Sequence, residues 1–144
     1  MHHLVQLALV AVDRSAEAGL ATACEAEIGN QIRDFVASNP PRFGVNWRVA
    51  MDVAIRAANW TIAVALLDAG GRDTSQVHAM LGRSLRDHGR FIITHLEWHP
   101  EIRGNHYLAD VCGLAFIAAA LAAILILGSW WIKKRLTGAG RHKG

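Results

Sequence analysis

The chain is poor in residues that interrupt helices and in residues that crosslink small domains. It has three prolines and two cysteines in 144 residues. A chain of this length is enough for one domain with a modest core. Few prolines and long alanine-rich runs favour helix throughout. Cys24 and Cys112 are far apart and form no Cys-x-x-Cys motif, so they predict neither a disulfide nor a metal site. We expect an all-α fold of antiparallel helices, without cofactor or metal.

Lysine is missing from the first 132 residues, and acidic residues are missing after Asp110. The first 132 residues carry ten arginines and twelve acidic residues, so this part of the chain is slightly acidic. The last twelve residues carry five basic residues and no acid: Lys133, Lys134, Arg135, Arg141 and Lys143. The net charge of +3 is therefore a property of the tail. It predicts no nucleic-acid-binding surface on the body.

Proline and glycine residues divide the sequence into helical regions. The run LVQLALVAV (4–12) lacks a basic segment before it and a clear cleavage site, so a first helix is favoured over an export signal. Pro40 and Pro41 end the first helical region, the pair Gly70-Gly71 ends the second, and Pro100 ends the third. The expected helical regions are 4–38, with one or two helices, then 45–71, 74–99 and 105 to about 131.

The last helical region contains an uncharged run, VCGLAFIAAALAAILILGSWWI (111–132), of 22 residues. A membrane span needs about 20 predominantly apolar residues. Trp130 and Trp131 fall where an interfacial aromatic belt lies, and the basic residues that follow predict a cytoplasmic C-terminus. A single-pass membrane helix is one interpretation. The other is a helix buried on most sides, which is hydrophobic all round for that reason.

Four stretches, in order along the chain, resemble heparinase II/III-like polysaccharide lyases, the relatives of alginate lyases. They are NPPRFGVNW (39–47), AMDVAIRAANW (50–60), SLRDHGRFIITHLEW (84–98) and RGNHYLADVCGLAFIAAAL (103–121). The resemblance covers roughly residues 28–121 and implies part of an N-terminal α/α-toroid domain. It ends near residue 121. We therefore expect a partial toroid over 1–121 and an unrelated apolar and basic tail over 122–144, as a frameshift or truncation would produce.

The resemblance implies β-elimination on uronate-containing polysaccharide. Asn105 matches the amide that neutralises the uronate carboxylate in the family, and His106 matches its candidate base. The family's catalytic tyrosine lies far beyond this motif, so Tyr107, the chain's only tyrosine, does not match it. The resemblance thus implies a lyase fragment without appreciable activity of its own. The full-length family enzyme would be periplasmic or cytoplasmic.

Elementary chemistry agrees with the implied role of Asn105 and His106. A helix that begins at Asn105 has free backbone N–H groups and a partial positive charge in its first turn, which favours an anion such as a sugar carboxylate. Asn supplies a neutral donor, and His accepts protons near neutral pH. The plainer alternative is that Asn105 caps the helix and His106 is only exposed.

Three further residues are candidate substrate-binding groups. Arg103 and Arg56 can pair with carboxylates, against the alternative of ordinary surface charge. Trp47 can stack on a sugar ring, against the alternative of core packing.

The expected helical region 74–99 contains four further histidines. His95 and His99 are four residues apart, but no third metal ligand is evident near them. His78 and His88 are expected on the surface.

Two functions from different classes therefore remain open. The first is a fragment of a lyase that acts on acidic polysaccharide. The alternative is a small helical interaction protein anchored in the membrane by 111–132. In either case, apolar helix faces left exposed would favour association with a membrane or with other chains.

Overall fold

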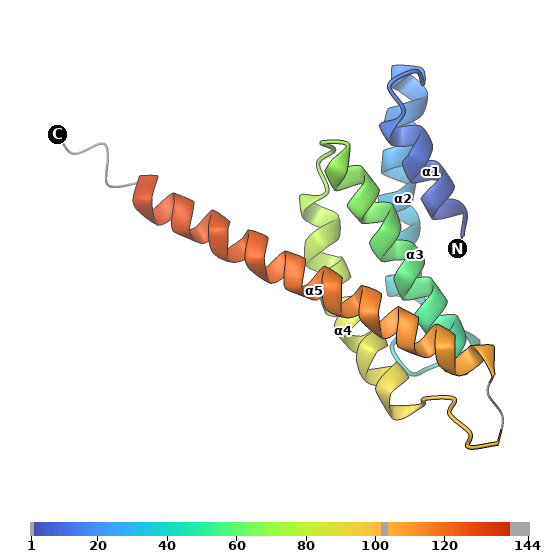
Figure 1. Ribbon diagram of the computed structural model, residues 1–144. Coiled ribbons are helices and arrows are strands. Elements are labelled where there is room, and N and C mark those ends of the chain that lie inside the picture. The colour runs from blue at the N-terminus through green and yellow to red at the C-terminus, as the bar shows by residue number, and fades with distance from the viewer. Residues whose placement is uncertain (1, 102–103, 139–144) are drawn as a thin grey trace.

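The structure of the chain is a computed structural model that describes residues 2–101 and 104–138 (Figure 1). Within these ranges it contains five α-helices, one short 3-10 helix and no strand. In chain order they are α1 (His3–Val12), α2 (Ala18–Ser38), η1 (Val45–Trp47), α3 (Ala50–Ala69), α4 (Ser75–Thr94) and α5 (Asn105–Gly138). The expected all-α class, with a long apolar last helix, is confirmed.

Local hydrogen bonds explain where the helices break. Between α1 and α2, the backbone N–H and the hydroxyl of Ser15 both donate to Asp13 Oδ1, at 2.8 and 2.7 Å. Such a turn competes with helical hydrogen bonding. The helix α4 ends at Thr94, earlier than the expected 99, because His95 leaves the helical region with φ −134° and ψ 30°. The last helix instead runs further than expected, to Gly138.

Helix α3 is the centre of the bundle. It packs against α1, α4 and α5, and α1 in turn packs on α2 (Figure 1). Its buried residues recur at three- and four-residue spacing, which defines a wide core face: Ala50, Val53, Ala54, Arg56, Ala57, Trp60, Ala63, Val64 and Leu67. The charged Arg72, just beyond α3, pairs with Glu25 of α2 at 3.5 Å and donates to the Ala11 carbonyl of α1.

A very close crossing places α5 on this centre. A Cβ atom built on Gly113 would lie 2.6 Å from the Cβ atom of Ala54 and 2.7 Å from its Cα atom, so only glycine fits there. The next contacts along α5 follow the same face, because Ile117 packs beside Gly89 of α4 and Ile124 beside Gly82. Small residues at the crossing thus bring the helix backbones together.

Most of the described side chains of α5 are exposed or only partly buried. Its fully described side chains are buried only along a narrow stripe, at Asp110, Gly113 and Ile117. The opposite face carries large apolar side chains, among them Leu108, Leu125 and Ile126 at 63%, 72% and 66% exposure. Figure 1 shows the C-terminal half of α5 extending beyond the other helices. A helix that is apolar all round but buried on one stripe leaves most of its apolar surface unpaired.

Two described helices, α3 and α5, are long and apolar enough to cross a membrane. Half of the apolar window of α3 is buried inside the bundle, as in the core helix of a soluble protein, whereas only 17% of that of α5 is buried. The side chains of Trp130, Trp131 and residues 133–135 lie outside the described part of the structure. The expected toroid and the domain boundary at 121 stay predictions, because this helical arrangement alone identifies neither.

Replacing Gly113 by Val is expected to destabilise the fold by about 1–3 kcal/mol, because the added side chain must displace the backbone of α3 at Ala54. Ala119→Val is the matched control on the exposed face of the same helix. Urea unfolding of both variants in mild detergent, followed by circular dichroism, measures the difference. Equal midpoints for the two variants would contradict the close crossing.

Candidate functional site

The predicted pair Asn105 and His106 lies in the first turn of α5, and both side chains are exposed. The first turn contains no acidic residue, so its free N–H groups face no carboxylate of their own turn. The ring of His106 is fixed by one strong contact, from Nδ1 to Oε2 of Glu97 at 2.5 Å. The site is therefore an exposed helix start with an amide and an anchored imidazole.

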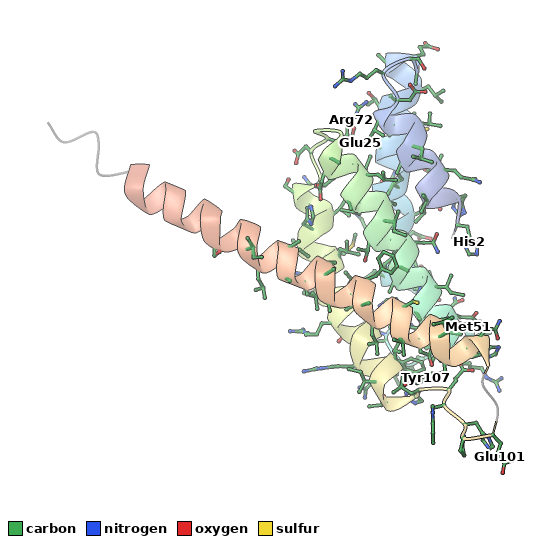
Figure 2. All side chains as sticks on the ribbon, in the orientation of Figure 1. His2, Glu25, Met51, Arg72, Glu101 and Tyr107 are labelled. Carbon is green, nitrogen blue, oxygen red and sulfur yellow. The ribbon has the colours of Figure 1, made fainter. Side chains whose placement is uncertain are left out.

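Glu97 connects this helix start to the rest of the bundle. It lies in the segment between α4 and α5, and its Oε1 accepts a hydrogen bond from the backbone N–H of Met51, at 3.1 Å. Its own backbone N–H donates to Oδ2 of Asp110, at 2.9 Å. Figure 2 shows Met51, near the start of α3, at the same end of the bundle as Tyr107 of α5. Glu97 thus joins α3, α5 and the intervening segment.

The environment of Glu97 favours its ionised form. Partial burial alone would raise the pKa of this carboxyl group. The hydrogen bond from His106 and the backbone N–H groups of Met51 and Ala50 outweigh burial, so the pKa of Glu97 lies below its ordinary value. The group beside His106 is therefore a carboxylate at neutral pH.

Asp110 is the innermost carboxyl group of this end of the molecule. It is fully buried, and its Oδ1 has no hydrogen-bond partner among the described residues. Burying a carboxylate is costly unless its oxygens are bonded, and only the Glu97 backbone N–H serves that purpose here. Asp110 thus fixes the backbone that carries Glu97. Arg103, the third residue predicted near this helix start, lies outside the described residues.

Arg56 and Trp47, the other predicted binding residues, lie in the interior, with 7% and 4% of their surface exposed. The guanidinium carbon of Arg56 is 4.5 Å from the ring centre of Phe35 and 5.3 Å from that of Trp47, within cation–π range. Trp47 and Phe35 also line a cavity of about 280 Å³, together with Arg83 and Ser84 of α4. The structure therefore places these two residues together, separately from Asn105 and His106.

His88 corrects a prediction, because it is fully buried and not on the surface. Its Nε2 accepts a hydrogen bond from Nε of Arg56 at 3.0 Å, so the ring proton is on Nδ1, which bonds the Ser84 carbonyl at 2.7 Å. The missed signal is helical spacing, since Leu81, Leu85, His88 and Ile92 share one face of α4. The polarity of His88 favours an exposed position, whereas its place on a face of leucine and isoleucine side chains buries it.

The Arg56–His88 pair has shifted proton affinities. Burial, together with repulsion from Arg56, lowers the pKa of His88 to about 3. Burial also lowers the pKa of Arg56 to about 10, although nearby Asp52 opposes this. Arg56 is thus still charged and His88 neutral at pH 7. One terminal nitrogen of Arg56, Nη2, has no hydrogen-bond partner among the described residues.

The remaining histidines provide no metal centre. Within residues 2–101 and 104–138, no group of three His, Cys, Asp or Glu side chains is close enough to hold a metal ion. His95 bonds the Phe91 carbonyl at 2.9 Å, and His99 accepts from the backbone N–H of Glu101 at 3.2 Å. These ring nitrogens of His95 and His99 make local hydrogen bonds to the backbone.

No protein-family model, curated protein or solved structure significantly matches the chain. The resemblance to heparinase II/III-like lyases therefore rests on the four quoted stretches alone.

His88→Gln is expected to reduce the pH dependence of stability. The unfolded chain binds a proton at His88 near pH 6.5, whereas the folded chain does so only near pH 3. The free energy of unfolding therefore decreases as the pH falls from 6.5 toward 3, by up to about 1.4 kcal/mol per pH unit, because only the unfolded chain takes up this proton. The measurement is urea unfolding of both proteins at pH 7.5, 6 and 5. As the pH falls, the free energy of unfolding of the wild type should decrease more than that of the variant. A constant difference would mean that His88 titrates normally.

Proposed function

We propose that the chain is part of the helical domain of a lyase that cleaves uronate-containing polysaccharide by β-elimination. The four quoted stretches support this, and one feature of the geometry carries it. At the start of α5 an exposed amide, Asn105, lies beside an exposed imidazole, His106, that is anchored on a carboxylate.

The chemistry of β-elimination suits these groups. The C5 proton of a uronate leaves more readily when its carboxylate is neutralised, and an amide with the N–H groups of a helix start can do this. An imidazole nitrogen accepts the proton, the electron pair forms the C4–C5 double bond, and the C4–O bond breaks. The released oxygen must take up a proton. Asn105 is proposed for the first task and His106 for the second.

Proton delivery to the leaving oxygen has no strong candidate in this chain. Tyr107 is the only tyrosine and follows His106 directly, at 38% exposure. In the family that the sequence resembles, a distant tyrosine does this work. We therefore propose that this chain binds uronate oligosaccharides without turning them over appreciably.

Binding of a uronate trisaccharide should weaken about tenfold or more in Asn105→Ala, because this removes a hydrogen bond to the charged carboxylate, and by less in His106→Ala, because this removes only a neutral contact. Isothermal titration calorimetry of the chain in detergent measures this. The matched control is His78→Gln, which removes another histidine–carboxylate pair, with Asp68 at 2.9 Å, away from α5's start. No binding by the wild type, or an equal loss in the control, would overturn the proposal.

A second function is favoured by a separate observation, the exposed apolar face of α5. We propose that 111–132 anchors the chain in a membrane as a single span, with the basic run after it on the cytoplasmic side. Only 17% of the apolar window of α5 is buried, which is far less than a soluble core helix needs. The anchored domain would act in interactions and not in catalysis.

The two functions compete for the same residues. Gly113 and Ile117 use the first half of 111–132 to pack on α3 and α4. The part from Leu125 to Gly138 has 14 residues, or about 21 Å of helix, against about 30 Å of bilayer core. A full span therefore requires α5 to leave the bundle from about Gly113 onward. Membrane insertion and the packed bundle are alternatives for this segment.

Ala122→Arg is expected to release the chain from membranes, because a central charge costs about 2.5–3.5 kcal/mol on insertion. Ala23→Arg, on the exposed surface of α2, is the matched control. Membranes from expressing cells are stripped with alkaline carbonate and floated on a sucrose gradient, which separates inserted chains from aggregates. Absence of wild-type chain from the floating fraction would exclude the anchor.

A further inference from the structure

We infer that Glu97 is a positioning residue for His106. It holds the ring as the Nδ1–H tautomer, so that Nε2 is the atom presented to a ligand at the start of α5. The identity of that ligand rests on the proposed function, whereas the state of the ring does not.

Both carboxylate oxygens of Glu97 take part in hydrogen bonds. Oε1 accepts from the backbone N–H of Met51, and Oε2 contacts Nδ1 of His106 at 2.5 Å. The low pKa of Glu97 makes it a carboxylate, which only accepts hydrogen bonds. The proton of this short contact must therefore be on Nδ1 of His106. In the neutral ring, Nε2 then carries the lone pair.

The other ring nitrogen of His106, Nε2, is not held in this way. The side chain of His106 is 47% exposed, and Nε2 has no hydrogen bond to any described residue. The ring is thus fixed at one nitrogen and open at the other. The carboxylate of Glu97 therefore lies on the Nδ1 side of the ring, opposite the nitrogen that a ligand can reach.

Glu97 is itself held in place by two helices. Its side chain is bonded to α3 through Met51, and its backbone is bonded to α5 through Asp110. A partner fixed by two helices restricts the orientation of the ring that it holds. Position and tautomer of His106 therefore depend on one residue outside α5.

The chain contains an internal comparison with the opposite arrangement. His78 contacts Asp68 through Nε2, at 3.0 and 2.9 Å to its two oxygens. Oδ1 of Asp68 also accepts from the hydroxyl of Thr74, so both contacts place the carboxylate as the acceptor and the proton on Nε2 of His78. Two exposed histidine–carboxylate pairs in one molecule thus have opposite expected tautomers.

Long-range proton–nitrogen spectra of the histidine-labelled chain at pH 8, without ligand, test the inference. The expected wild-type result is Nδ1–H for His106 and Nε2–H for His78. Glu97→Ala should convert His106 to a mixture and leave His78 unchanged, which also reports that the variant is folded. Glu97→Gln should restore part of the Nδ1–H form, because its amide oxygen also accepts. Asp68→Asn should affect His78 alone.

An Nε2–H signal for His106 in the wild type would overturn the inference, whether or not any variant folds. An unchanged tautomer in Glu97→Ala would do the same. Titration with the uronate trisaccharide separates the two proposals. The expected Nδ1–H form without any uronate binding would remove the proposed function and leave Glu97 as the positioning residue, whereas binding with the wrong tautomer would remove only this inference.

Discussion

The contact between Gly113 and Ala54 determines where the rest of the site lies. Because no Cβ atom fits between them, α5 approaches α3 closely enough to bury Asp110, one turn before Gly113. Asp110 then bonds the backbone of Glu97, and Glu97 bonds both Met51 and His106. A larger residue at the crossing would push α5 outward and separate the carboxylate from the ring. The position of the exposed His106 ring thus depends on the close contact between Gly113 and Ala54 in the interior.

Periodicity and turn residues predict most of the helices, because these signals are local. The end of α4 at Thr94 escapes them, since His95 leaves the helix although the apolar pattern continues. The start of the last helix at Asn105 is predictable from the chemistry of its first turn. Its partner Glu97 is not, because the contact depends on how the segment between α4 and α5 folds back. The helical spacing of His88 with Leu81 and Leu85 predicts its burial, whereas its polarity alone predicts exposure.

The apolar run of α5 illustrates why hydropathy alone gives two interpretations. A helix that crosses the bundle on a stripe of small residues needs few large apolar side chains of its own. This helix nonetheless exposes Leu108, Phe116, Leu125 and Ile126 on its other sides. Burying that surface requires either lipid or further protein. The free energy available from covering it, roughly 25 cal/mol per Å² of apolar surface, favours either partner equally.

Two histidine pairs in this chain show how environment divides one residue type between structure and chemistry. His88 accepts a hydrogen bond from Nε–H of Arg56, is fully buried and stays neutral, so its ring holds the core together. His106 donates to a carboxylate, is half exposed and keeps one ring nitrogen without a hydrogen bond to the described residues, so that nitrogen is open to a ligand. A cation beside a buried imidazole opposes its protonation. Of the two rings, only that of His106 has a nitrogen without a hydrogen bond to the described residues.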